Sequence, residues 1–438
     1  MSRVLPRDMS PAPACASRWK RQAAIAGTGI LVGSYDLGAI SVAFSPLKRD
    51  WHLSSAVLTT LGTATLVGML VASLATGLLA DRFGRRRLIL ADFVLFVVAT
   101  ALAALAPNFG VLAAARFFTG LAIGTEFAVV FPFVAETAPP AERGRAMAWI
   151  MWAANFGTLA AYGLGALLLH LDARSGWRLS LGLGTLLALP VLALRSQLGE
   201  SADWKATRLV RLRDIVRSTA QAMGRERRWS SVATTFLYQV SDQGLGLVLP
   251  LLLASVLASS AASSAAGATA VKAITIPAAT LTVLAVERIG RRRLQIAGFA
   301  GRGLALGALG IALVTLAHVS PLLIGALLAA GYFFGAAGPD KTTVIVPAEA
   351  FPTTVRGSSQ GVTQGAGRLG GIFGVTLYGV LAQLGGPGAG LLLFAGTSLL
   401  GAVVTILAVR ETRTAHSTES SPPTMASPAE LPAATATP

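Results

Sequence analysis

Twelve apolar stretches, each about 20 residues long, follow one another along the chain with polar segments between them. An α-helix of that length crosses the hydrocarbon core of a bilayer. Only 13% of the residues are charged, whereas soluble proteins have about 25%. The sequence therefore predicts an all-α membrane protein with twelve transmembrane helices. They begin near residues 23, 55, 88, 110, 147, 178, 231, 265, 294, 321, 357 and 387.

The positive charges are distributed unevenly between the two sides of the predicted membrane. A net charge of +16 would suggest nucleic-acid binding in a soluble protein. Here most of the Lys and Arg residues fall in the termini or in loops on one side, and only Lys48, Arg49, Arg174 and Arg178 fall in loops on the other. This is the positive-inside pattern. It predicts a bacterial inner (plasma) membrane protein with both termini cytoplasmic, in contact with lipid and not with nucleic acid.

The chain repeats itself across a central polar segment. ADRFGRRR (Ala80–Arg87) returns as VERIGRRR (Val286–Arg293), and each stretch joins two apolar segments. VAETAPPAERG likewise has a counterpart in PAEAFPTTVRG. Two pseudo-symmetric six-helix bundles are therefore expected, joined by a linker that lies on the inner membrane surface. The predicted segments are a cytoplasmic N-terminal segment (1–22), two bundles (23–196 and 231–409), the linker (197–230) and a disordered tail (410–438).

The repeated charges predict a gate on the cytoplasmic side. Acids that follow helices 2 and 8 can pair with arginines at neighbouring helix ends, and such pairs must break when that side opens. The alternative is that the arginines only fix the orientation of the chain. The candidate gate residues are Asp81, Arg82, Gly84, Arg85, Glu136, Arg143, Glu287, Arg291, Glu349 and Arg356.

Five stretches resemble the major facilitator superfamily, in the branch of sugar porters, organic-acid–proton symporters and phosphate–proton symporters. DRFGRRR is its most specific signature. SYDLGAI (Ser34–Ile40) looks like its helix 1, and RFFTGLAIGTE (Arg116–Glu126) looks like its helix 4. ESADW (Glu200–Trp204) resembles the ESPRW stretch after helix 6. GPDKTTVIVPAEAFPTTVRG (Gly338–Gly357) is similar to helix 10 of phosphate symporters. The resemblance implies alternating access between two bundles.

Three ionisable residues inside the first bundle are candidates for proton coupling, because charges within a membrane are costly. Asp36 and Arg116 lie about 14 Å and 9 Å below the outer ends of their helices, a difference that an arginine side chain can cover. In proton-coupled sugar porters the matching Asp and Arg pair, and the Asp carries the proton. Glu126 matches a Glu of organic-acid symporters and an Asp of phosphate symporters, which implies a second proton site near the cavity floor. The alternatives are permanent structural pairs or packing acids.

Seven residues are predicted to bind substrate. Helix 7 carries FLYQVSDQGLG, in which four polar residues span less than two turns. Sugar porters have QQxSGxN there. Phosphate symporters have other residues at the places of Gln239 and Gln243, so neither pattern is matched in full. Asp340 takes the place of a phosphate-binding Asn, and an acid there repels an anion unless it is protonated or paired with Lys341 or Lys272. The predicted set is Asn155, Tyr238, Gln239, Asp242, Gln243, Asp340 and Lys341.

The buried positive residues Lys272, Arg302 and Arg368 favour a small anion as substrate. The sequence thus predicts proton-coupled symport of an aromatic or aliphatic carboxylate by a monomer without metal or cofactor. Phosphate import, sugar import, drug export and a non-transporting receptor are the alternatives. A multi-span enzyme is disfavoured because the sequence has no cluster of nucleophile and base and no Walker motif.

Overall fold

The computed structural model describes residues 13–199, 212–224, 228–257, 260–316 and 318–412, and all its regular elements in these ranges are helices. The first half contains α1 (Pro13–Asp50), α2 (Ser55–Phe83), α3 (Arg85–Ala104), α4 (Phe109–Thr137), α5 (Arg143–Leu171) and α6 (Gly176–Arg195). The second half contains α9 (Trp229–Leu257), α10 (Ala261–Ala273), α11 (Thr275–Ile289), α12 (Arg291–Thr315), α13 (Pro321–Ala337), α14 (Pro339–Ala350) and α15 (Arg356–Ala408). Two 3₁₀ turns, η1 (Pro140–Glu142) and η3 (Thr353–Val355), complete the order.

Eleven helices in the described ranges are long and apolar enough to cross a membrane. The last of them, α15, has 53 residues, too many for one crossing. Its helical geometry is interrupted at Gly385 and at Gly386, where φ is +74°, a conformation that favours glycine. The chain turns back at this point, so α15 supplies the last two of the twelve predicted crossings.

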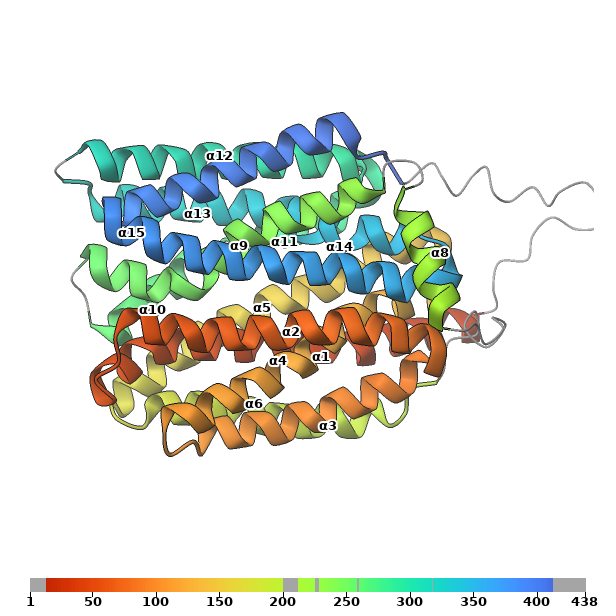
Figure 1. Ribbon diagram of the computed structural model, residues 1–438, viewed down its shortest axis with the longest axis horizontal. Helices are drawn as coiled ribbons and strands as arrows, with labels where there is room; N and C mark the ends of the chain where they lie inside the picture. Colours follow the sequence, from red (N-terminus) through yellow and green to blue (C-terminus); the bar gives the residue numbers. More distant parts are fainter. Residues whose placement is uncertain (1–12, 200–211, 225–227, 258–259, 317, 413–438) are drawn as a thin grey trace, which may run out of the picture.

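The helices run side by side as an elongated bundle, with α1–α6 in one half and α9–α15 in the other (Figure 1). The short helix α8 (Leu212–Gly224) crosses the ends of the others at the end of the bundle where α1 begins and α15 finishes. We call this the inner end. In the second half, a break at Ile274 separates α10 from α11, and another at Gly338 separates α13 from α14. Asp340 and Lys341 directly follow the second break.

Glycines bring α2 and α4 into backbone contact. A side chain at Gly120 would place its Cβ 2.1 Å from the carbonyl oxygen of Thr65, and one at Gly124 would lie 2.4 Å from that of Met69. Small residues allow such close packing between membrane helices. The glycines of RFFTGLAIGTE therefore fix α4 against α2, which orients Arg116 toward the interior.

The linker is described only over α8. This helix packs against α2, α15 and η3, and Ala222 joins Phe351 and Val355 in a small apolar cluster. Glu200 and Trp204, which carry the ESADW resemblance, lie outside the described residues. The predicted domain boundaries stay predictions.

Candidate functional site

A central cavity of about 100 Å³ lies between the two halves. Its walls come from α1, α4 and α5 on one side and from α9, α10, α14 and α15 on the other. Five residues of the predicted substrate set line it, and these are Asn155, Gln239, Asp242, Gln243 and Asp340. Lys272 and Arg368 also line it, so the cavity collects ionisable side chains from several helices in one place.

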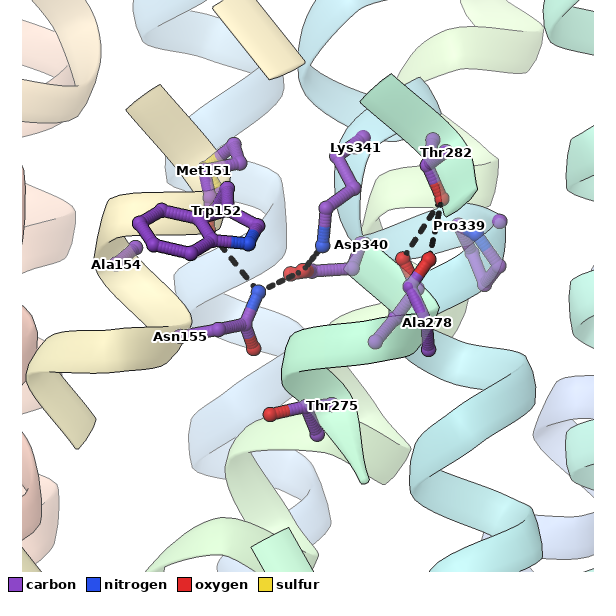
Figure 2. A network of polar contacts seen from close by, with 12 residues as sticks. Met151, Trp152, Ala154, Asn155, Thr275, Ala278, Thr282, Pro339, Asp340 and Lys341 are labelled. Atoms are coloured by element: carbon purple, nitrogen blue, oxygen red, sulfur yellow. Dashed lines mark hydrogen bonds and ion pairs between the residues drawn. The ribbon is translucent and has the colours of Figure 1, made fainter. Parts of the chain in front are cut away.

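Asn155 and Asp340 join the two halves across the cavity. Asn155 donates from Nδ2 to Oδ2 of Asp340 at 2.9 Å, and Lys341 forms an ion pair with the same carboxylate. Figure 2 shows both partners converging on Asp340, while Asn155 also donates to the backbone carbonyl of Met151 at 3.0 Å. The acid at this position is therefore neutralised by its neighbour, which removes most of its repulsion toward an anion. Lys341 itself is fully buried and acts on the cavity through Asp340.

A second acid, Asp242, is paired with Arg302. Nη2 of Arg302 lies 3.5 Å from Oδ1 of Asp242, and its Nε donates to Oγ of Ser241 at 3.0 Å. The cavity acids Asp242 and Asp340 are thus each matched by a cation behind the wall. Lys272 and Arg368 also line the cavity, so the basic residues at the site outnumber the acidic ones.

Arg368 has hydrogen-bond donors that nothing in the described part of the chain accepts. Its Nε and Nη2 are buried without a partner, and the residue is 1% exposed. The guanidinium lies 4.6 Å from the ring centroid of Phe127, which also lines the cavity. Buried charged donors without partners are costly. A planar anion that entered the cavity could accept from Arg368 and lie beside Phe127.

Asp36 and Arg116 form a buried ion pair. Asp36 directly precedes Leu37, which lines the cavity. Arg116 donates from Nη1 to Oδ1 of Asp36 at 2.9 Å and from Nη2 to Oδ2 at 2.5 Å. Both residues are buried, and Nε of Arg116 donates to Oγ1 of Thr65 at 3.3 Å. This two-point geometry is the strongest form of an arginine–carboxylate contact. The structure thus brings the predicted partners together, while the proton-carrying role stays a prediction.

Glu126, which we expected near the cavity floor, is not among the cavity-lining residues in the described part of the chain, and its proton-coupling role stays a prediction. It forms an ion pair with Arg195 of α6, whose Nη2 donates to Oε2 of Glu126 at 2.9 Å. Asp92 of α3 lies 3.8 Å from the same guanidinium. All three side chains are buried, so two acids share one arginine. Arg195 was not singled out from the sequence, because this residue stands at the end of its apolar stretch.

We expect Arg195→Met to destabilise the protein by about 3–5 kcal/mol, because it leaves two buried carboxylates without a counter-charge. Thermal unfolding in detergent measures this change. In a protein that already carries Asp92→Asn and Glu126→Gln, Arg195→Met should lower the stability much less. The two acids are then neutral, so the loss of the arginine leaves no buried carboxylate without a counter-charge. An equal cost in both backgrounds would contradict this account of the cluster.

Tyr238 packs behind the residues that line the cavity, and its predicted role in substrate binding stays a prediction. Its ring packs edge-on against Phe299, with centroids 6.1 Å apart, and the guanidinium of Arg302 lies 5.6 Å from its centroid. It is not among the lining residues within the described chain. Residues 238 and 239 are neighbours on a helix and point about 100° apart, and the structure turns Gln239 to the cavity and Tyr238 to the bundle interior.

At the inner end, the first half carries the predicted gate charges in a compact cluster. Arg85 donates from Nη2 to Oε1 of Glu136 at 2.9 Å and from Nη1 to the carbonyl of Ala80 at 2.5 Å. Gly84 joins α2 to α3 with φ of +96°, a conformation that costs other residues energy. The glycine of GRRR thus makes the sharp turn that points Arg85 back at the end of α2.

The second half repeats this arrangement around Arg291. Its Nη2 donates to Oε1 of Glu349 at 2.8 Å, and its Nη1 donates to Oε2 of Glu287 at 2.7 Å and to the carbonyl of Val286 at 3.2 Å. Gly290 has φ of +92°. The sequence repeat is therefore also a repeat of contacts, donor by donor.

The other gate candidates differ in their surroundings. Arg143 and Arg356 each donate from Nε to the backbone carbonyl five residues earlier, which stabilises the turns before α5 and α15. Arg82 is exposed and lies over the ring of Phe83 at 5.2 Å. The side chain of Asp81 lies outside what the structure describes.

One contact of Glu287 crosses between the halves. The backbone N–H of Arg145 donates to Oε1 of Glu287 at 3.1 Å. A Cβ at Gly144 would lie 2.2 Å from Nη2 of Arg291, so the first turn of α5 fits tightly against this cluster. These contacts join the two halves at the inner end, and the role of Glu287 and Arg291 as a gate stays a prediction. At the cavity wall, two more contacts join the halves, since Ser41 donates to the carbonyl of Leu247 at 3.0 Å and Tyr162 donates to that of Gly246 at 2.9 Å.

We expect Glu287→Gln to shift the protein toward an inner-open state by roughly 10-fold, because a hydrogen bond to a charged group is worth about 1.5–3 kcal/mol. Spin labels at Arg87 and Arg293, exposed residues in the two halves, report the distance across the inner end. Glu349→Gln is the matched control, because Glu349 contacts Arg291 and Thr412 in its own half. Equal shifts in both variants would contradict a cross-half role for Glu287.

The chain is similar to known membrane transporters over nearly its whole length. The family model for sugar (and other) transporters matches residues 23–420. A Bacillus subtilis protein named as a niacin/nicotinamide transporter, NiaP, is 27% identical over 82% of this chain and 87% of its own length. The gentisate transporter of Corynebacterium glutamicum is 25% identical over 88% and 86%.

Among solved structures, the proton:xylose symporter XylE from E. coli superposes with a TM-score of 0.76 over 91% of this chain and 97% of XylE, at 21% identity. This likeness confirms the predicted major facilitator fold. The chain therefore belongs to the sugar (and other) transporter family of membrane transporters.

Proposed function

We propose that this protein is a secondary transporter that imports a small organic anion, a carboxylate on a planar ring, together with protons. The observation that carries the proposal is Arg368, a buried guanidinium that lines the central cavity with two nitrogens unpartnered. A carboxylate is the group that an arginine binds most directionally. The inner end would face the cytoplasm, and the chain would work as a monomer without enzymatic activity.

The charges around the cavity support an anion. Asp242 and Asp340 line it and are paired with Arg302 and Lys341, so their effect on a bound anion is largely cancelled. Lys272 contributes a further cation from α10, 4.3 Å from the ring centroid of Tyr332. A neutral sugar would leave this excess positive charge uncompensated in a buried site.

The names of two similar transporters support a planar ring in the substrate. Niacin and gentisate, named for the two similar transporters, both carry a carboxylate on a planar aromatic ring. Phe127 in the cavity wall offers a flat face for such a ring. We infer that Arg368 takes the carboxylate and Phe127 the ring.

Coupling to protons would use Asp36 and Arg116, with Glu126 as a second candidate. Asp36 can be protonated only if its contact with Arg116 loosens, because a guanidinium in contact favours the ionised carboxylate. Motion of Arg116 during the transport cycle would thus switch the proton affinity of Asp36. Glu126 shares Arg195 with Asp92, so protonation of one acid would leave a neutral cluster.

Sugar import is the second candidate function. The family model is described as one for sugar transporters, and Gln239 and Gln243 place amides at the cavity that could bond sugar hydroxyls. Phosphate import and drug export have no comparable observation in their favour. A receptor without transport activity would have no need for the paired Asp36 and Arg116.

The test is a binding comparison of nicotinate with nicotinamide, which have the same ring and differ in the carboxylate. We expect nicotinate to bind the purified protein roughly 10–100-fold more tightly, as the value of a charged hydrogen bond implies. Gentisate, phosphate and xylose complete the panel. Binding of xylose alone would favour the sugar function, and equal binding of nicotinate and nicotinamide would contradict recognition of the carboxylate by Arg368.

A further inference from the structure

Four polar residues follow one another at intervals of four along the inner half of α15. They are Arg356, Gln360, Gln364 and Arg368. Residues four apart lie on the same face of an α-helix, so they form one row. The row begins with a residue at the inner gate and ends with the arginine of the cavity.

The two glutamines in the middle of this row are buried without hydrogen bonds. Gln360 is 0% exposed and Gln364 is 1% exposed. For both residues, Nε2 and Oε1 have no partner in the described part of the chain. Buried amides in proteins nearly always have partners, because an unmet donor or acceptor is costly. Two such amides in succession indicate a surface that receives partners in another state of the protein.

From the cavity residue Arg368, the row runs along α15 toward the inner end. On one side of it, Gly361 lies against the backbone of Ser73 in α2, where a Cβ would meet the carbonyl oxygen at 2.4 Å. On the other side, a Cβ at Gly367 would lie 3.1 Å from Cγ of Gln239 in α9. An α-helix has 3.6 residues per turn, so the side chains of Gln360 and Gln364 point between the directions of Gly361 and Gly367 around α15. Its upper member, Arg368, meets Phe127 of α4, so the glutamines lie beneath the cavity toward the inner end.

We propose that Gln360 and Gln364 form an inner release subsite for the transported anion. Gln364 and Gln360 stand one and two turns, about 6 and 12 Å, below Arg368 along the helix axis. When the inner gate opens, water reaches the row, and the two amides offer N–H donors to a carboxylate that leaves Arg368. That the ligand is a carboxylate rests on the proposed function. That Gln360 and Gln364 become exposed to the inner side does not.

Cysteine accessibility tests the opening of the row without a substrate. Cys15 is the one cysteine of the sequence, so Cys15→Ser gives a clean background for Gln360→Cys and Gln364→Cys. Inside-out and right-side-out vesicles are treated with a membrane-impermeant, negatively charged thiol reagent. We expect labelling at both positions from the inner side and none from the outer side. Gln295→Cys is the matched control, a buried amide on α12 that bonds Thr405 at 3.2 Å, and it should not react.

Absence of labelling from the inner side, or equal labelling from both sides, would overturn the inference. Size-exclusion profiles identify any variant that fails to fold, and Gln364→Met then serves as a second variant. In transport of nicotinate, it should raise the inner-side KM about 10-fold and leave the outer-side KM unchanged. An equal rise on both sides would place Gln364 in the central site and overturn the release role. Absence of nicotinate transport in the unmodified protein, with inner labelling intact, would refute the proposed substrate and not the path.

Discussion

Asp36→Asn is expected to abolish uphill uptake of the substrate while exchange of substrate across the membrane continues. Asn resembles a permanently protonated Asp, so the carrier can still move between its two states but cannot release a proton. Asp36 is the partner that Arg116 holds with two hydrogen bonds, and Arg116 has no other carboxylate among its described contacts. Accumulation of labelled nicotinate under an imposed pH gradient should fall at least 100-fold, as the loss of a coupling step requires.

Asp50→Asn is the matched control for this prediction. Asp50 also lies on α1, but its side chain is partly exposed and pairs with Arg49 next to it, outside the predicted pathway. Accumulation and exchange of substrate by Asp50→Asn should both match those of the unmodified protein. If Asp36→Asn still accumulated substrate against a gradient, Asp36 would not be the coupling residue.

Arg368→Met should weaken substrate binding roughly 10–100-fold and should not lower thermal stability. The loss follows from removal of charged donors to the carboxylate, each worth about 1.5–3 kcal/mol. The stability follows from the unpartnered Nε and Nη2 atoms, because replacing an unpaired buried charge by an apolar side chain of similar length removes a penalty. Functional sites commonly trade stability for activity in this way. Isothermal titration calorimetry with nicotinate measures the affinity, and thermal unfolding of the same sample measures the stability.

Arg302→Met separates this effect from the loss of any buried arginine. Arg302 is equally buried but donates to Ser241 and pairs with Asp242. Its removal leaves Asp242 uncompensated, so the variant should unfold at a lower temperature than the unmodified protein. A lower unfolding temperature for Arg368→Met as well would contradict the view that its guanidinium awaits a ligand.

The crossings and the repeated inner charges could be predicted because each depends on local sequence. A run of 20 apolar residues spans a bilayer in any context, and the turn at Gly84 follows from a glycine between two helices. The contact of Asp36 with Arg116 could be expected from the depths of the two residues and from the family pattern. The division of the last apolar region was also visible, because Gly385, Gly386 and Pro387 interrupt it.

The sequence could not specify which faces of the helices meet across the bundle. Tyr238 and Gln239 both carry a polar group at the end of the side chain. Only the packing of α9 decides which of the two side chains faces the cavity. The partner of Glu126 comes from the end of α6, where hydropathy cannot distinguish a buried arginine from one in a loop. Arg195 was missed for this reason, whereas Asp92 lies inside the apolar stretch that begins near residue 88 and could have been found as an ionisable residue within a membrane helix. Phe127 was missed because nothing in an apolar helix distinguishes the ring that lies beside the cavity arginine from the other aromatic residues.

The movement of protons with an organic anion is the central claim, and it can be measured directly. The purified protein is sealed into liposomes with a pH-sensitive dye in the outer solution, and nicotinate, gentisate, phosphate or xylose is added in turn. We predict that the outer solution becomes alkaline when nicotinate or gentisate is added, and that Asp36→Asn abolishes the change. Alkalinisation with xylose alone, or uptake of labelled nicotinate without any proton movement, would contradict the account.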